Sequence, residues 1–157
     1  MNNTSRLLEQ ASELVSLEEF DEAFDIYNKI LEKEPKNINA LIDKAVTLQR
    51  IGKNSQSLKL FNRALNIEEV NIDALIGKGT VLHAQKKFFD AIACYDSILN
   101  INPKFPMALA YKGLSLAEQG KINDALKYFK KALTIDKNYD LAQISKEKAL
   151  KLLKSKK

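Results

Sequence analysis

Apolar residues follow two periods in this chain, one of three or four residues within short segments and one of 34 residues between segments. A fixed period in this range is typical of chains built from stacked copies of one supersecondary unit. The pattern therefore predicts a repeat protein whose units share a continuous core. Leucine marks the longer period in two parallel columns, which are Leu7, Leu41, Leu75 and Leu109, and Leu14, Leu48, Leu82 and Leu116.

Each unit shows the spacing of two short amphipathic helices. In the first helix, a leucine, a small residue and a second leucine stand at i, i+4 and i+7, which places them on one face. In the second helix, a small residue precedes an aromatic by four positions, as Ala91 precedes Tyr95. Small residues let crossing helices approach closely, and the aromatic fills the neighbouring groove. The columns are Ala11, Ala45, Gly79 and Gly113; Ala23, Ser57, Ala91 and Ala125; and Tyr27, Phe61, Tyr95 and Phe129.

Turn-forming residues separate these helical stripes. Gly52 and Gly120 stand between the two helices of their units, Pro35 and Pro103 follow second helices, and Pro106 begins the next helix. The sequence therefore predicts an all-α fold, an α-solenoid of helix–turn–helix units with a C-terminal capping helix. We expect one domain over residues 1–157, with units at about 4–37, 38–71, 72–105 and 106–139 and the capping helix at 140–157.

The repeated residues resemble the tetratricopeptide repeat family, whose unit carries large, small and aromatic residues at these spacings. The sequence departs from the family pattern in few places. Leucine replaces the frequent tryptophan at the first large position of every unit, Ser57 replaces alanine, and Glu69 and Lys137 stand where proline is common. These changes weaken no predicted helix.

Composition agrees with a globular helical protein. Hydrophobic residues make up 45% of the 157 residues and charged residues 29%, with 5 Gly and 3 Pro. The N-terminal residues from Met1 to Arg6 carry no cationic-then-apolar signal pattern, and no apolar run approaches the length of a membrane span. Cys94 is the only cysteine, so no disulfide within the chain is possible. We expect a cytoplasmic protein.

The charge is concentrated at the C-terminus. The chain has a formal net charge of +5, and the segment from Asp140 onward carries six lysines against Asp140 and Glu147. The apolar stripe of this segment favours a capping helix with a solvated basic face. An alternative stays open, in which the lysines contact nucleic acid or an acidic membrane surface. These lysines are Lys146, Lys148, Lys151, Lys154, Lys156 and Lys157.

Few residues suggest catalysis. His83 is the only histidine, and a nucleophile–base pair with Cys94 has no third residue to orient it, so a polar surface residue and a core thiol are the simpler interpretation. Gly77 and Gly79 lie within a helix pattern and do not form a phosphate-binding loop. No metal-ligand spacing occurs. We therefore predict a protein that is not an enzyme and needs no cofactor or metal.

What the resemblance supplies is a surface. In this family the first helices of successive units line a concave groove, so residues one turn from the packing leucines are expected to face a partner. The resemblance therefore predicts a protein-binding scaffold that holds an apolar or amphipathic peptide or a partner protein. Self-association into an oligomer is an alternative. The groove residues would be Leu8, Ser12 and Val15; Ile42, Asp43, Val46 and Gln49; Ile76, Thr80 and His83; and Ala110, Tyr111, Leu114 and Ala117.

One subset of the family resembles a clamp for acidic C-termini of heat-shock chaperones, formed by Lys, Asn and Arg side chains. Placing that clamp on units one to three finds Asp43 and Asp73 but no cation, and placing it one unit later also finds none. Burying a carboxylate beside acidic groups without a partner is costly. The sequence therefore predicts that the groove prefers an apolar segment with one or two basic residues.

Overall fold

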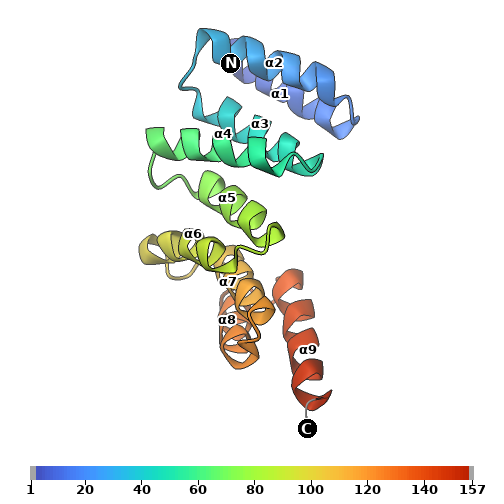
Figure 1. Ribbon diagram of the computed structural model, residues 1–157, viewed down its shortest axis with the longest axis vertical. Coiled ribbons are helices and arrows are strands. Elements are labelled where there is room, and N and C mark those ends of the chain that lie inside the picture. The colour runs from blue at the N-terminus through green and yellow to red at the C-terminus, as the bar shows by residue number, and fades with distance from the viewer. Residues whose placement is uncertain (1–2, 156–157) are drawn as a thin grey trace. The chain divides into compact units, whose positions relative to one another are not determined.

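The computed structural model describes residues 3–155, and this part of the chain consists of nine α-helices joined by short turns (Figure 1). The prediction of an all-α repeat solenoid is confirmed, because consecutive helices form helix–turn–helix pairs of nearly equal length. The helices are α1 (Asn3–Ser16), α2 (Phe20–Lys33), α3 (Ile38–Arg50), α4 (Asn54–Ile67), α5 (Ile72–Ala84), α6 (Phe88–Ile101), α7 (Pro106–Glu118), α8 (Ile122–Ile135) and α9 (Asp140–Ser155).

The turns inside the four pairs share one backbone conformation. Gly52 and Gly120 adopt φ values of 76° and 78°, as their type predicts. Glu18 and Lys86 occupy the same place in the other two pairs and adopt φ values of 63° and 61°. The left-handed turn is therefore imposed by the helix pair as a whole, since it forms whether or not glycine is present.

Asparagine side chains begin two of the first helices. Asn37 Oδ1 accepts a hydrogen bond from the backbone N–H of Ala40 at 2.9 Å, and Asn71 Oδ1 accepts one from Ala74 at 3.0 Å. Each satisfies an amide that the helix itself leaves without a partner. At the corresponding place before α7, Phe105 precedes Pro106, and proline is suited to the first turn because it has no N–H.

The helices divide into two compact units, Met1–Lys78 and Gly79–Lys157, with the boundary inside α5. The organisation of the chain as one domain stays a prediction. In the first unit, the core around α1 and α2 contains buried Ala11, Ala23 and Tyr27. Ser57 is also buried, and its Oγ donates to the carbonyl of Ala45 at 2.7 Å. The serine that replaces alanine is therefore satisfied without leaving the core.

Glycine contacts in both units confirm the expected packing of small residues against aromatic rings. Gly77 lies against the Phe61 ring in the first unit, at a place where a Cβ atom would overlap the ring. In the second unit, a Cβ atom at Gly79 would lie 2.5 Å from Tyr95 Cε1, and one at Gly113 would lie 2.6 Å from Phe129 Cε1. These glycines therefore permit close packing inside helices, and they form no phosphate-binding loop.

The last helix, α9, packs on α8 and α7 in the second unit. Its buried face presents Ala142, Ser145 and Ala149. The opposite side carries Gln143 and Glu147, which stand one period after Leu109 and Gly113, and Gln143 Nε2 donates to Glu147 Oε1 at 2.8 Å. Two positions of the face on which a further helix would pack are therefore polar, while the third position of the same column holds Leu150, which is 40% exposed. Lys156 and Lys157, predicted to belong to the capping helix, lie outside the described residues.

Candidate partner-binding surface

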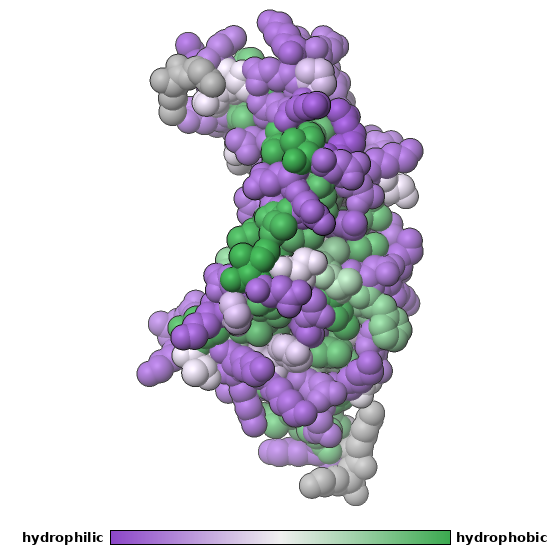
Figure 2. Space-filling model, turned by 90° about the vertical axis from the view of Figure 1, so that its left-hand side faces the viewer, coloured by the Kyte–Doolittle hydropathy of each residue, from purple (hydrophilic) through white to green (hydrophobic). Residues whose placement is uncertain are grey.

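Most of the predicted groove residues lie on partly open faces of the first helices. In the first unit, Val46 exposes 48% of its surface and Ser12 is also exposed. The other predicted residues with partial exposure are Leu8, Val15, Asp43, Gln49 and Ile76 in the first unit, and Thr80, His83, Tyr111, Leu114 and Ala117 in the second. Figure 2 shows one face of the molecule, on which hydrophobic patches lie among hydrophilic side chains.

Two of the predicted groove residues are buried, and the prediction that they face a partner is wrong for both. Ile42 exposes 8% of its surface and Ala110 exposes none. Ala110 belongs to a core cluster with Leu109, Ala132 and Ala142, where α7, α8 and α9 meet. Burial removes the apolar surface of these residues from water within the fold, so they serve packing.

A pocket opens in the first unit between α1, α2 and α3. Its volume is about 170 Å³, and four of its lining residues, Ser12, Val15, Asp43 and Val46, belong to the predicted groove. The lining is completed by Tyr27 and Thr47, which are each 2% exposed and form the floor. We call this cavity the Asp43 pocket.

The hydrogen bonds at the pocket floor run in one direction, from Tyr27 to Thr47 and from Thr47 to the backbone carbonyl of Asp43. Thr47 Oγ1 donates its single proton to the backbone carbonyl of Asp43 at 2.8 Å. The Tyr27 hydroxyl lies 3.5 Å from Thr47 Oγ1, and because the Thr47 proton is already committed, Tyr27 is the donor in that contact. Both hydroxyl protons are therefore used, and the oxygen lone pairs that remain are acceptors.

The Asp43 carboxylate sits in an unfavourable place for a negative charge. Burial raises the pKa of Asp43, and the nearby Asp73 on α5 raises it further. Within residues 3–155 the ion pairs join other residues, and none neutralises Asp43. Its neighbour in sequence, Lys44, donates instead to Asn28 Oδ1 on α2. The pocket therefore holds a partly buried carboxylate without a protein cation.

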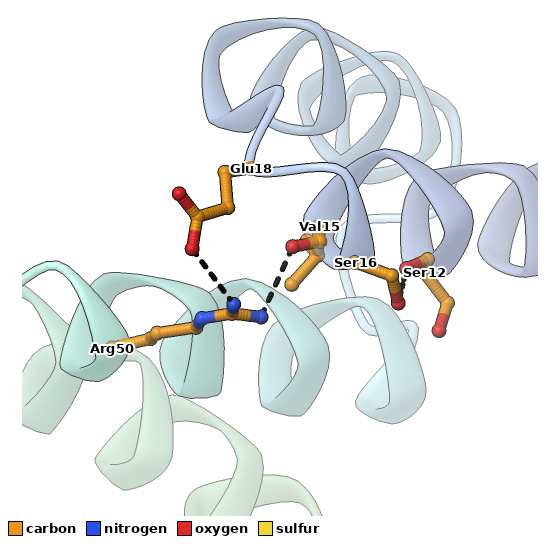
Figure 3. A network of polar contacts seen from close by, with 5 residues as sticks. All are labelled: Ser12, Val15, Ser16, Glu18 and Arg50. Atoms are coloured by element: carbon orange, nitrogen blue, oxygen red, sulfur yellow. Dashed lines mark hydrogen bonds and ion pairs between the residues drawn. The ribbon is translucent and has the colours of Figure 1, made fainter.

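Arg50 fixes the wall of this pocket (Figure 3). From the end of α3, its guanidinium donates to the backbone carbonyl of Val15 at 3.0 Å and pairs with Glu18 at 3.4 Å. It also lies over the Phe20 ring, 5.5 Å from the centroid. Because Val15 lines the pocket, these contacts hold α1 and α3 in register at its edge. They also commit the Arg50 charge away from Asp43.

The second unit has a different polar cavity around His83. The cavity measures about 430 Å³ and is lined by His83, Ala84, Lys86, Phe88 and Glu118. His83 Nδ1 pairs with Ser115 Oγ at 2.9 Å, and burial lowers the pKa of His83, which keeps the ring neutral at neutral pH. Cys94 is buried in the core. These positions agree with a polar surface residue and a core thiol.

Tyr111 closes the position in the second unit that corresponds to the Asp43 pocket. It stands two repeats after Asp43, and its ring stacks on Tyr95 with centroids 5.8 Å apart. Ser115, the counterpart of Thr47, is paired with His83. The Tyr95 hydroxyl consequently makes no hydrogen bond within the described part of the chain. Equivalent positions in the two units thus have different chemistry.

Sequence reasoning missed the two residues of the pocket floor. The repeat pattern places Tyr27 only in the aromatic core column and gives Thr47 no separate role. A signal was available for Thr47, because Thr47 and Ser115 place hydroxyls in a column that also holds Val81 and must pack against a neighbouring helix. Buried hydroxyls need partners, so such positions indicate polar contacts.

The stretch from residue 3 to residue 155 contains no group of three or more His, Cys, Asp or Glu side chains arranged to hold a metal ion. It also contains no helix with the length and apolar character needed to cross a membrane.

Two protein-family models match this chain. The model for the N-terminal TPR repeats region of Psidin matches residues 8–104, and the tetratricopeptide repeat model matches residues 106–139. The chain belongs to the tetratricopeptide repeat (TPR) family. No curated protein matches this TPR chain.

Solved structures with the same fold include other TPR proteins. PilF of Pseudomonas aeruginosa is similar with a TM-score of 0.87 and 19% identity, over 97% of this chain and 69% of PilF. YrrB, described as a TPR protein with an unusual peptide-binding site, has a TM-score of 0.73 and 21% identity, over 94% of this chain and 76% of YrrB. The first TPR of Spaghetti (RPAP3), bound to the HSP90 peptide SRMEEVD, has a TM-score of 0.69 and 17% identity, over 74% of this chain and 92% of that one.

Proposed function

We propose that this TPR protein is a protein–protein interaction module that binds an apolar or amphipathic segment of a partner on the open faces of its first helices. The observation that carries the proposal is the Asp43 pocket, which the first helices of two successive repeats form together with α2. TPR repeats are in general interaction modules and not enzymes. Two proteins of similar fold bind peptides by their own descriptions, YrrB and the first TPR of Spaghetti.

The exposed apolar side chains support a partner of mixed character. Val46 and Val15 line the pocket beside Asp43, so apolar and acidic groups lie side by side on one face. Apolar surface of this kind is covered favourably by aliphatic side chains of a partner, and the burial contributes about 25 cal/mol per Å². A scaffold role, in which one partner is held for another, and a cytoplasmic location both belong to this proposal.

Fluorescence anisotropy with labelled amphipathic peptides tests the proposal. We expect Val46→Ala to weaken binding several-fold, because it removes an exposed apolar group from the pocket wall. Val70→Ala is the matched control, since Val70 has a similar exposure, 44% against 48%, but lies in the turn between α4 and α5. Equal affinity of Val46→Ala and the unmodified protein would remove this face from the binding surface.

The same assay compares acidic and basic peptides. The Asp43 and Asp73 carboxylates disfavour an acidic peptide such as the one bound by the Spaghetti TPR, so we expect the peptide with basic residues to bind more tightly.

A salt titration separates this mode from the alternative on α9. Binding of nucleic acid through the exposed Lys148 and Lys151 would weaken steeply with salt, because counterions are released from phosphates.

A further inference from the structure

We propose that the Asp43 pocket binds a single cationic side chain of the partner segment, either a lysine ammonium or an arginine guanidinium. This inference rests on the proposed function, because it names the residue that the interaction module recognises. It is carried by the hydrogen-bonding character, charge and shape of one cavity in the first unit.

The buried polar groups of the pocket accept hydrogen bonds. The Thr47 hydroxyl donates its proton to the backbone carbonyl of Asp43, and the Tyr27 hydroxyl donates its proton to Thr47 Oγ1. The lone pairs that remain on these oxygens, together with the Asp43 carboxylate, make the floor a set of acceptors, and the exposed Ser12 hydroxyl in the lining can donate or accept. An ammonium or guanidinium group carries donors only, so it matches this set, whereas a carboxylate offers none of the donors that the pocket needs.

The charge of the pocket points to the same ligand. Asp43 is partly buried and Asp73 lies close enough to act on it. Lys44, the neighbour of Asp43 in sequence, is engaged with Asn28, and Arg50 on the same helix is engaged with Glu18. A carboxylate that has lost water without gaining a partner is unfavourable, and a cation from outside restores the balance. The ligand therefore supplies the positive charge that no side chain within residues 3–155 places beside Asp43.

The shape of the pocket suits a long side chain with a charged end. Val15 and Val46 form apolar walls above the polar floor, as the aliphatic stem of lysine or arginine requires. The volume of about 170 Å³ corresponds to about six water molecules at their share of liquid volume. A space of this size suits a single extended side chain.

The repeat architecture shows that this pocket is particular to one place. The positions one period before and after Asp43 hold Glu9 and Gly77, and the position two periods later holds Tyr111. Among these positions, only Tyr111 has a tyrosine in the place that Tyr27 takes beside Asp43. That tyrosine is Tyr95, and the Tyr111 ring stacks on it. The carboxylate, the hydroxyl pair and the open volume therefore come together at Asp43.

Small probes test the pocket without a peptide. We expect butylammonium chloride, titrated into the full chain at constant ionic strength, to shift the amide NMR signals of Val15, Asp43, Val46 and Thr47 in a saturable way. Sodium butyrate, which has a similar stem and the opposite charge, should leave them unshifted. Asp43→Asn should abolish the response, and the control Asp25→Asn should retain it, because Asp25 is an exposed carboxylate on α2 of the same unit.

A peptide pair then tests recognition of a partner. An amphipathic peptide with one central lysine should bind about tenfold more tightly than the same peptide with norleucine, and Asp43→Asn should abolish the difference.

Equal binding of both peptides, with no butylammonium response at the pocket, overturns this inference and leaves the proposed function standing. Saturable butylammonium binding without binding of either peptide supports the cation site and counts against the proposed function. A butylammonium response that persists in Asp43→Asn refutes the assignment to Asp43.

Discussion

The ring of Tyr111 stacks on the ring of Tyr95, with centroids 5.8 Å apart and planes inclined by 20°. In the first unit, Tyr27 corresponds to Tyr95 and Asp43 corresponds to Tyr111, two repeats earlier. A filled aromatic contact in one unit therefore stands where the other has an open acidic pocket, and of the lining positions only the tyrosine is the same in both.

The two tyrosine hydroxyls should have opposite effects on stability. Tyr95 has a buried hydroxyl without a hydrogen bond in the described chain, and burial raises the pKa of its phenol. Tyr95→Phe should raise the free energy of unfolding by about 1 kcal/mol, because it removes an unsatisfied buried group. Tyr27→Phe should lower it by about 0.5 kcal/mol through loss of the contact with Thr47. Urea denaturation measures both, and a loss of stability in Tyr95→Phe would show that its hydroxyl has a partner.

Asp43→Asn should stabilise the protein at neutral pH. The pKa of Asp43 is raised in the fold above its ordinary value of about 3.9, so the folded state favours the protonated acid. The stabilisation of the fold by protonated Asp43 is fully present below the pKa of the unfolded state, and it is lost as pH rises through the pKa of the folded state. The gain from Asn should therefore be largest at pH 7 and shrink toward pH 4. Thermal melts across this range check it, and Asp25→Asn should show no such trend.

Lys86→Gly should stabilise the second unit by about 0.5–1 kcal/mol. Lys86 adopts a left-handed backbone with φ of 61°, which costs a residue with a Cβ more than it costs glycine. Lys87→Gly is the control, because the neighbouring lysine has an ordinary φ of −85° and should gain nothing. Chemical denaturation of the two variants compares them directly. Glu18→Gly is a poorer test, because Glu18 also pairs with Arg50.

Deletion from Asp140 onward should destabilise the second unit by several kcal/mol. The deletion uncovers apolar surface of Ala132 and Phe129 and their neighbours, in clusters to which α9 contributes Ala142 and Ala149. Calorimetry and light scattering would report a lower melting temperature and association. The double variant Lys148→Ala/Lys151→Ala keeps the cap and should melt as the unmodified protein does. A truncated chain that melts unchanged and stays monomeric would contradict the role of α9 as a cap.

The sequence by itself determined the repeat and its helices. Leucines at i and i+7 with a small residue between them leave one geometry in which two such helices bury their stripes, and the 34-residue period repeats that geometry. The same local logic predicted the close contacts of Gly79 and Gly113, because small residues opposite rings have a single packing solution. The family followed from these columns and is confirmed.

Only the tertiary structure decided which side chains remain open on the first helices. Ile42 and Ala110 share the helix face of Ile76, but contacts from neighbouring helices bury them, and periodicity along one helix does not record those contacts. The direction of the Tyr27 and Thr47 hydrogen bonds likewise depends on atoms from two helices meeting at one point. Sequence spacing fixes which face a residue lies on, whereas the distance to the next helix fixes whether that face is core or pocket.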